Sequence, residues 1–405
     1  MESTSADQIA QELLDHCLAG RPWPEQLLDA LIAEDGNRAL FRIVVERLGD
    51  LFEPHLCLVY ANLFAEVIAR RIPSLHADHL VERYERIRLP RTLDRNPSRI
   101  RNVFVLSRVT LGADIAVTSI LLDAAKKCFP ESQIYFVGTQ KSWELFAADG
   151  RLNHLPITYG RGGTLDSRLS VWQELREAVS QRNSIVIDPD SRLTQLGLLP
   201  ICTEEDYYFF ESRAYGADGS EPLPALARRW AEATFGVSDA SAYIETGLDA
   251  AEFAATVSFG VGENLDKRVP DPFETELLRI LPRPLLIDKG VGGEEAQRVE
   301  RAVAKSEGHK KGIIVTWEGA FAGFAAHIQK SSLYAGYDSS GGHVAAACGI
   351  PMLSIFDGFV SERMFQRWRP TGPGRISVIP AAEYSVAALL NHIAAQLPDL
   401  LASRG

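Results

Sequence analysis

Short apolar runs alternate with longer helical stretches through most of this chain, and this alternation constrains its fold more than any other feature. The run 103–106 is too short for a helix and is typical of a buried strand, and a helix is expected after it, over about 114–128. Further strands are expected at 134–137, 184–188 and 207–210, and further helices at 142–148, 166–180 and 222–235. Strands that alternate with helices predict a parallel sheet with helices on both faces.

The same alternation restarts near residue 256. Strands are expected at 256–259, 285–287, 313–316, 333–337 and 352–356, with helices from about 272 and at 294–306 and 321–330. Two successive units of this kind predict an α/β protein with two Rossmann-like domains that face a cleft, over 96–250 and 251–405. Ligands of such sheets bind beyond the carboxyl ends of the strands, so functional residues are expected in the loops that follow strands.

Residues 1–95 have a different pattern. Apolar residues recur there at helical spacing, for example at Leu27, Leu28, Leu31 and Ile32, and again over 56–68. An all-helical N-terminal region is therefore expected, followed by a charged, proline-containing linker at 90–98. The 405 residues, 46% of them hydrophobic, are enough to bury more than one core.

Charge and cysteine usage limit the classes of partner. The formal net charge of −11, from 42 basic and 53 acidic residues, argues against a nucleic acid as the main partner. The five cysteines are scattered without Cys-x-x-Cys spacing, which favours the cytoplasm and argues against a disulfide framework or a zinc site. The first eleven residues are too polar for a signal peptide, and no apolar run is long enough to span a membrane.

Two pairs of residues have metal-like spacing. His76 and His79 are accompanied by no carboxylate or thiolate cluster and are interpreted as one face of a helix. Asp188 and Asp190 follow a strand, where they would be either metal ligands or part of a turn. No metal site is predicted.

The loop after the expected strand 333–337 is the strongest candidate for a ligand site. It consists of Asp338, Ser339, Ser340, Gly341, Gly342 and His343, and leads into a helix of small residues. A helix start offers free backbone N–H groups and the positive end of the helix dipole, which suits a diphosphate. The two glycines would let a phosphate approach the backbone closely. A capped helix without any ligand would give the same pattern, because Gly-rich turns are common.

Two more loops follow expected strands. One contains Gly262, Asn264, Lys267 and Arg268, and its basic pair either neutralises phosphate charge or is simply solvated. The other leads to Asp114, which would lie near a helix N-terminus. An acidic residue in the first turn of a helix is favourable there without any function.

Taken together, the three loops resemble glycosyltransferase family 9, the ADP-heptose:lipopolysaccharide heptosyltransferases, which are inverting enzymes of the GT-B fold. The stretch Asp338-Ser-Ser-Gly-Gly-His343-Val-Ala-Ala-Ala-Cys-Gly-Ile-Pro351 is similar to the family signature Asp-Ser/Thr-Gly-x-x-His-Leu-x-Ala-Ala-x-Gly-x-Pro. The resemblance implies that Asp338, Ser339 and His343 contact the nucleotide diphosphate. Ser340 stands where the family has glycine.

Two further stretches carry the resemblance, which covers about residues 100–380. The stretch from Gly112 to Pro130 is similar to the family's Gly-Asp-x-x-x-Thr-x-Pro-x-Leu helix, although Ala113 interrupts the Gly-Asp pair. This match implies that Asp114 is the catalytic base. The segment 264–270 is similar to the family's Lys-x-Trp-Pro segment, which contacts the diphosphate, but it lacks the tryptophan.

The loop that contains Asp288, Lys289 and Gly290 departs from the family pattern and is expected on the nucleoside side of the same site.

The resemblance implies a hexosyl- or heptosyltransferase that moves a sugar, heptose in the family's usual case, from a nucleotide diphosphate to an acceptor hydroxyl with inversion. ADP is the favoured nucleotide, and neither a metal nor a further cofactor is implied. The implied acceptor is a glycan or glycolipid of the cell envelope, as in lipopolysaccharide synthesis, which would bring the enzyme to the inner face of the cytoplasmic membrane.

Two alternatives remain open at this point. One is a GT-B-like nucleotide-sugar epimerase, and the other is a non-catalytic nucleotide-binding or scaffold protein with a degenerate cleft.

Overall fold

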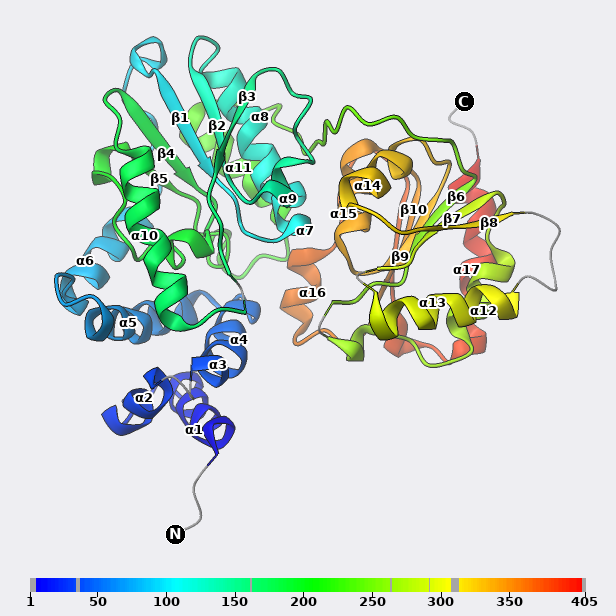
Figure 1. Cartoon of the computed structure of the whole chain (residues 1–405), viewed down its shortest axis with the longest axis horizontal. Helices are drawn as coiled ribbons and strands as arrows, with labels where there is room; N and C mark the ends of the chain where they lie inside the picture. The colour runs from blue at the N-terminus through cyan, green and yellow to red at the C-terminus, as the bar shows by residue number, and fades with distance from the viewer. Residues whose placement is uncertain are drawn as a thin grey trace. The chain divides into compact units, whose positions relative to one another are not determined.

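The computed structural model of this protein describes residues 5–33, 37–160, 162–262, 264–290, 292–306 and 313–402 (Figure 1). The chain forms two compact units. The first comprises 1–110, 121–140 and 151–240, and the second comprises 111–120, 141–150 and 241–405. Across the described residues, no helix combines the length and the apolar character that crossing a bilayer would require.

The first unit contains a five-stranded parallel sheet in the order β3-β2-β1-β4-β5. Its strands are β1 (Asn102–Leu106), β2 (Gln133–Gly138), β3 (Leu152–Pro156), β4 (Ser184–Asp188) and β5 (Tyr207–Phe209). The central strand β1 and its neighbour β4 are apolar along nearly their whole length because both faces of the sheet are covered. Figure 1 shows α10 (Leu165–Val179) in front of this sheet and α11 (Leu223–Phe235) behind it.

The N-terminal region is helical, as the sequence predicts. Its elements are α1 (Ala6–Leu18), α2 (Glu25–Ile32), α3 (Asn37–Ala39), the π-helical turn η1 (Leu40–Val45), α4 (Glu46–Asp50), α5 (Pro54–Arg71) and α6 (Ala77–Ile87). These helices share one hydrophobic core with the first sheet, in which Tyr60 and Phe64 belong to the same cluster as Phe104 and Leu175.

Hydrogen bonds fasten this region to the sheet as well. The Tyr60 hydroxyl donates to the Gln195 carbonyl at 3.3 Å, and Arg83 Nη1 donates to the Gly197 carbonyl at 2.7 Å. The segment predicted as a linker is also held, since the Leu93 N–H donates to the Thr234 carbonyl at 2.8 Å. The helices therefore form part of the first unit's core.

The second unit contains a six-stranded parallel sheet in the order β11-β10-β9-β6-β7-β8. Its strands are β6 (Ala255–Ser258), β7 (Leu285–Asp288), β8 (Ile314–Trp317), β9 (Tyr334–Tyr337), β10 (Met352–Phe356) and β11 (Ile376–Pro380). Its helices are α12 (Phe273–Ile280), α13 (Gly293–Ser306), α14 (Phe321–Gln329), α15 (Ser340–Cys348), α16 (Glu362–Trp368) and α17 (Val386–Leu401). Two parallel sheets with surrounding helices confirm the predicted α/β class and the two Rossmann-like units.

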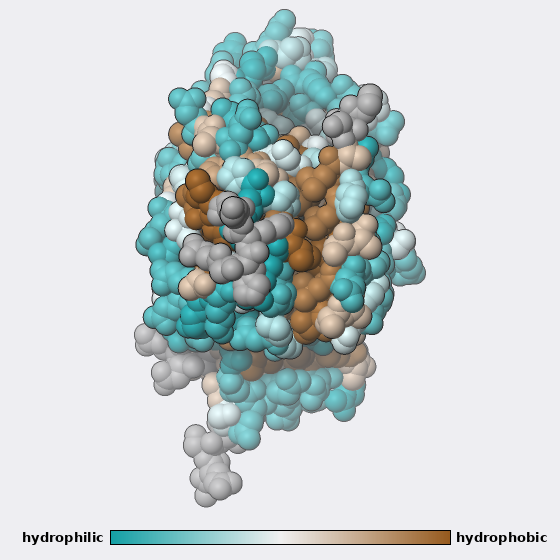
Figure 2. All heavy atoms as spheres, turned by 90° about the vertical axis from the view of Figure 1, so that its right-hand side faces the viewer, coloured by the Kyte–Doolittle hydropathy of each residue, from teal (hydrophilic) through white to brown (hydrophobic). Residues whose placement is uncertain are grey.

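One outer strand of the second sheet is partly uncovered. Figure 2 views the molecule from the side on which β8 lies in Figure 1, and apolar side chains lie there among polar ones. Ile313 is 66% exposed and Val315 on β8 is 39% exposed. Such apolar positions are compatible with an edge strand as short as four residues.

Two predicted helices differ from the observed ones. The helix expected over 114–128 consists of α7 (Leu111–Ala113), a π-helical turn η3 (Asp114–Thr118) and α8 (Ser119–Cys128). The helix expected over 142–148 is only the short α9 (Gln140–Trp143). Four elements, β3, β11, α16 and α17, lie outside the predicted pattern.

Candidate functional site

The strand order of the second sheet reverses between β9 and β6, which are neighbours. A reversal of this kind leaves a crevice at the carboxyl ends of the strands, where ligands of open α/β sheets bind. The loop after β9 leads directly into α15, whose N-cap Ser339 has extended backbone angles. The loop after β6 contains the one-turn helix η6 (Leu265–Lys267). The strand order therefore places both predicted loops at this reversal.

Lys267 joins these two loops. Its Nζ lies 2.6 Å from Asp338 Oδ2, and the two side chains are only 17% and 13% exposed. The neighbouring Asn264 fixes the loop, because its Oδ1 accepts from the Asp266 N–H at 3.0 Å and its Nδ2 donates to the Gly358 carbonyl at 3.3 Å. The ammonium group is thus held beside the start of α15.

The two glycines in the first turn of α15 have different reasons to be glycine. A Cβ at Gly341 would lie 2.4 Å from the Tyr334 hydroxyl oxygen, which itself lies 3.2 Å from Ser339 Oγ. A Cβ at Gly342 would meet Met352 at 3.3 Å and lie 3.9 Å from Ser354 Oγ. Packing against Tyr334 therefore explains why residue 341 is a glycine. Both glycines leave the backbone at the helix start without side chains.

Ser354 was not predicted as a site residue. It lies on β10 and is 1% exposed, and its hydroxyl has no hydrogen-bond partner among the residues that the structure describes. A buried hydroxyl without a partner costs free energy, which marks the space near Gly342 as one where a polar group would be stabilised. In the sequence, nothing distinguishes this serine from an ordinary strand residue.

His343 is buried in the first turn of α15, at 6% exposure. Burial lowers its pKa, the nearby Asp338 opposes that shift, and Lys267 adds to it. Its ring contacts the Trp368 ring with 5.9 Å between centroids. At neutral pH the imidazole is therefore uncharged, so it has one N–H donor and one acceptor nitrogen.

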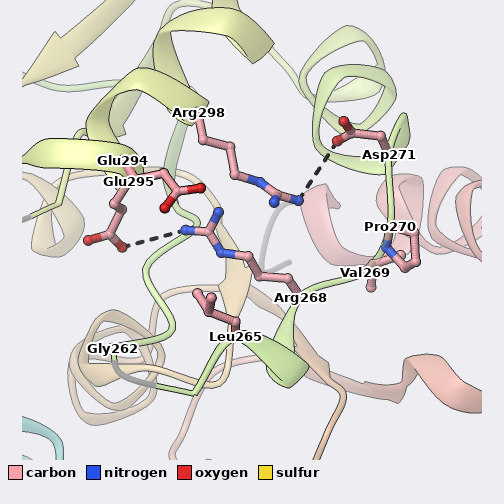
Figure 3. Close-up of a pocket in the computed structure, with 9 residues that line it drawn as sticks. All are labelled: Gly262, Leu265, Arg268, Val269, Pro270, Asp271, Glu294, Glu295 and Arg298. Atoms are coloured by element: carbon pink, nitrogen blue, oxygen red, sulfur yellow. Dashed lines mark ion pairs between the residues drawn. The ribbon is translucent and has the colours of Figure 1, made fainter.

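Arg268 lines a pocket whose lining does not include Lys267. The pocket has a volume of about 340 Å³. Figure 3 shows the residues that line it, which are Gly262, Leu265, Arg268, Val269, Pro270, Asp271, Glu294, Glu295 and Arg298. In it Arg268 Nη2 lies 3.9 Å from Glu295 Oε1, and Arg298 Nη2 lies 3.8 Å from Asp271 Oδ1. The predicted basic pair was Lys267 and Arg268. In the structure Lys267 pairs with Asp338 and Arg268 with Glu295, so the two residues have separate acidic partners.

Glu295 is a second residue that the sequence predictions missed. A Cβ on Gly260 would lie 2.9 Å from its Oε1, and a Cβ on Gly290 would lie 2.4 Å from its carboxyl carbon. The carboxylate therefore sits between two glycine backbones, one after β6 and one after β7. An acidic residue in the first turn of a helix after a Gly-rich loop was the available signal.

The predicted nucleoside-side residues follow β7. Burial raises the pKa of Asp288, and its Oδ1 accepts from the Gly290 N–H at 3.1 Å. Gly290 has φ of +74°, a conformation that favours glycine. Lys289 Nζ lies 2.8 Å from Glu300 and 3.1 Å from Glu318, so its charge is shared with two acidic side chains.

Asp114 lies in segment 111–120, which belongs to the second unit. The residue is fully buried, and its Oδ1 accepts from the Thr118 hydroxyl at 2.8 Å. A Cβ on Gly112 would lie 3.2 Å from His343 Cδ2 and 3.4 Å from Ser340 Oγ. The turn that carries Asp114 therefore packs against the same helix start that Lys267 approaches.

The carboxyl ends of the first sheet hold a buried polar network. Asp190 pairs with Arg213 at 2.9 Å, and these side chains are 0% and 4% exposed. Asp188 accepts from the Thr194 and Tyr207 hydroxyls and from the Ser191 N–H. The metal-like carboxylates after β4 are thus bound by protein donors, and no cluster of three or more metal-ligating residues occurs in the described ranges.

The sequence matches no family model and no curated protein. Solved structures do match. A family 9 glycosyl transferase from Veillonella parvula superposes with a TM-score of 0.54 at 16% identity, over 76% of this chain and 98% of that one. The E. coli heptosyltransferase WaaC, solved with ADP, gives a TM-score of 0.53 at 14% identity over 74% and 99%.

A third solved structure, the E. coli ADP-heptose lipopolysaccharide heptosyltransferase II, gives a TM-score of 0.50 at 16% identity over 74% and 98%. Nearly the whole of each of these structures is matched, while about a quarter of this chain has no counterpart in them. The likeness confirms the predicted GT-B architecture, and this chain has the fold of the family 9 glycosyltransferases.

Proposed function

We propose that this protein is a glycosyltransferase that moves a sugar from a nucleotide diphosphate to an acceptor hydroxyl. The observation that carries the proposal is the cluster at the start of α15. Lys267 Nζ lies 2.6 Å from Asp338 there, and the turn that carries Asp114 packs against the same helix. A cation, bare helix-end amides and a carboxylate are the three groups that such a transfer needs.

The helix start is the proposed binding site for the diphosphate. Backbone N–H groups at a helix start and the helix dipole stabilise negative charge. Asp338 holds Lys267 in place, and an ammonium group has three N–H donors, so a phosphate oxygen can share it. Neutral His343 supplies one more hydrogen-bonding group, and no divalent cation is required in this scheme.

Chemistry at this site would begin with the acceptor hydroxyl. Asp114 takes its proton as the oxygen attacks the anomeric carbon from the face opposite the leaving group, so the configuration inverts. The diphosphate gains charge as the bond breaks, and the groups around it act where that charge develops. Base assistance of this kind contributes about 10²- to 10⁴-fold to the rate.

The donor and acceptor are inferred from different evidence. The E. coli heptosyltransferase WaaC was solved with ADP, which favours an ADP-linked sugar such as ADP-heptose. Glu295, whose carboxylate lies between two glycine backbones, would accept hydrogen bonds from the ribose hydroxyls in this proposal. The proposed acceptor is a glycan or glycolipid of the cell envelope, met at the inner face of the cytoplasmic membrane.

Calorimetry tests the binding step. ADP, UDP and GDP are titrated into the wild type, into Lys267→Ala and into Lys127→Ala. Lys127 is the matched control, because it forms ion pairs with Asp123 and Asp239 in the first unit. We expect at least one nucleotide to bind and Lys267→Ala alone to weaken it, whereas binding of none of the three would overturn the proposal.

Turnover tests the chemical step. Release of the nucleoside diphosphate from candidate nucleotide sugars is followed with acceptor glycans, in EDTA, for the wild type and Asp114→Asn. Equal rates for the two proteins would exclude Asp114 as the base. Free sugar released without any acceptor would indicate an epimerase, and binding without turnover over a wide donor set would indicate a scaffold.

A further inference from the structure

Asp114 begins a π-helical turn that ends at Thr118. Such turns accommodate one extra residue in a helix and are frequent at functional sites. After the turn, Ile120, Leu121 and Leu122 on α8 are all buried, so the helix keeps its packing. The turn therefore absorbs an extra residue without disturbing the core.

Two consecutive hydroxyls in this helix bond differently. Ser119 Oγ donates to the Ile115 carbonyl at 2.5 Å, which is the usual bond of a helical serine or threonine to the residue four positions earlier. Thr118 Oγ1 instead donates to the side chain four positions earlier, the Asp114 carboxylate, at 2.8 Å. Both Thr118 and Asp114 are fully buried.

We infer that Thr118 is a positioning residue for Asp114, holding its carboxylate ionised and in one orientation for the transfer reaction. This inference rests on the proposed function of Asp114 as the base. A hydroxyl that donates to a carboxylate favours the charged form, and burial disfavours it. Thr118 donates to Asp114 Oδ1 in a fully buried site, so its hydroxyl fixes one carboxylate oxygen and favours the ionised form.

Other titratable groups face this turn from α15 and its approach. His343 lies against Gly112, and Asp338 and Lys267 lie next to His343. None of these groups changes in a Thr118 variant. A change in pH dependence that appears with the loss of the Thr118 hydroxyl and disappears on its return is therefore assigned to Asp114.

The experiment compares Thr118→Val, which keeps the shape but lacks the hydroxyl, with Thr118→Ser, which restores it. We expect Thr118→Val to lower kcat by about 10- to 100-fold at neutral pH and to move the acidic limb of the pH–rate profile to higher pH. Thr118→Ser should recover the rate to within about 3-fold of the wild type. The control is Ser119→Ala, which removes a hydroxyl bonded to backbone and should leave the acidic limb unchanged.

A second readout does not depend on turnover. The carboxyl carbon of Asp114 is followed by ¹³C NMR during a pH titration, with its signal assigned from Asp114→Asn. The titration midpoint should rise in Thr118→Val and return in Thr118→Ser. An unchanged midpoint, or a pH–rate profile that Thr118→Ser fails to restore, would overturn the inference, whereas wild-type protein that turns over no donor would overturn only the proposed function.

Discussion

The carboxyl ends of the two parallel sheets use ion pairs in opposite ways. After β4 of the first sheet, Asp190 and Arg213 are 2.9 Å apart and at most 4% exposed. Beside β9 of the second sheet, Lys267 and Asp338 are 2.6 Å apart but 17% and 13% exposed. A short ion pair is therefore no guide to function by itself, and its access to solvent and its neighbours distinguish the two cases.

The backbone conformations of the loops around the two ion pairs also differ. The loop after β4 contains side-chain-bearing residues at positive φ, namely Asp190, Gln195 and Leu196, which cost free energy unless the surroundings fix them. The loop after β9 instead presents glycines at a helix start. The first loop is held by its own contacts, and the second leaves backbone donors for a ligand.

The largest expected effect is a difference in stability between variants of the two ion pairs. Arg213→Ala leaves a buried carboxylate without its cation and should lower the free energy of unfolding by about 3–5 kcal/mol. Lys267→Ala removes a more accessible charge and should cost no more than about 1 kcal/mol. Urea unfolding of both variants measures this difference, and equal losses would break the comparison.

The next effect concerns pH. Burial raises the pKa of Asp188 to about 6, from 3.8, against the three hydrogen bonds that it accepts. Because the folded state holds this proton more tightly than the unfolded state, stability from this group is present below about pH 4 and is lost as the pH rises through about 6. The loss amounts to about 3 kcal/mol at 1.36 kcal/mol per pKa unit.

The variant Asp188→Asn isolates that contribution. Its hydrogen bonding differs from the wild type by a constant amount, so the stability difference between the two proteins should change by about 3 kcal/mol from pH 4 to pH 7. Chemical unfolding at several pH values measures the change. A difference that stays constant over this range would show that Asp188 is ionised throughout.

The smallest expected effect concerns Gly341, at the helix start after β9. Gly341→Ala places a methyl group against the Tyr334 hydroxyl and should destabilise the protein by about 1–3 kcal/mol. That Cβ would also lie 2.8 Å from two carbons of the Tyr334 ring, so Tyr334→Phe should recover only part of the loss in the double variant. Thermal unfolding of the two single variants and the double variant measures the coupling, and purely additive effects would contradict the packing explanation.

The sequence predicts the central elements of the fold well and its outer elements poorly. The central strand β1 and its neighbour β4 are continuous apolar runs because helices cover both faces, and such runs are visible in a sequence. The missed strand β3 reads Leu-Asn-His-Leu-Pro and lies at a sheet edge, where polar residues are tolerated. Tertiary pairing alone identifies it as a strand.

The candidate site shows the same division. The loops that meet at α15 could be predicted because each follows a strand in the chain. The direction of each side chain could not, since the turn around Lys267 points this residue toward Asp338 and Arg268 toward Glu295. The π-helical turn at Asp114 could not be predicted either. Ala113 is an extra residue relative to the Gly-Asp pair of the family motif, and the sequence does not show whether such a residue ends the helix or is accommodated in a π-helical turn.

The core that the N-terminal helices share with the first sheet has a consequence for biosynthesis. The hydroxyl of Tyr84 bonds to Glu211, a residue 127 positions later in the chain. At translation rates of about 5–20 residues per second, the helices are made roughly 6–25 s before the residues that complete their core. During that interval the apolar side chains of these helices that pack on the first sheet have no partner. This protein should therefore engage chaperones at the ribosome for longer than a two-domain chain that begins directly with its first strand.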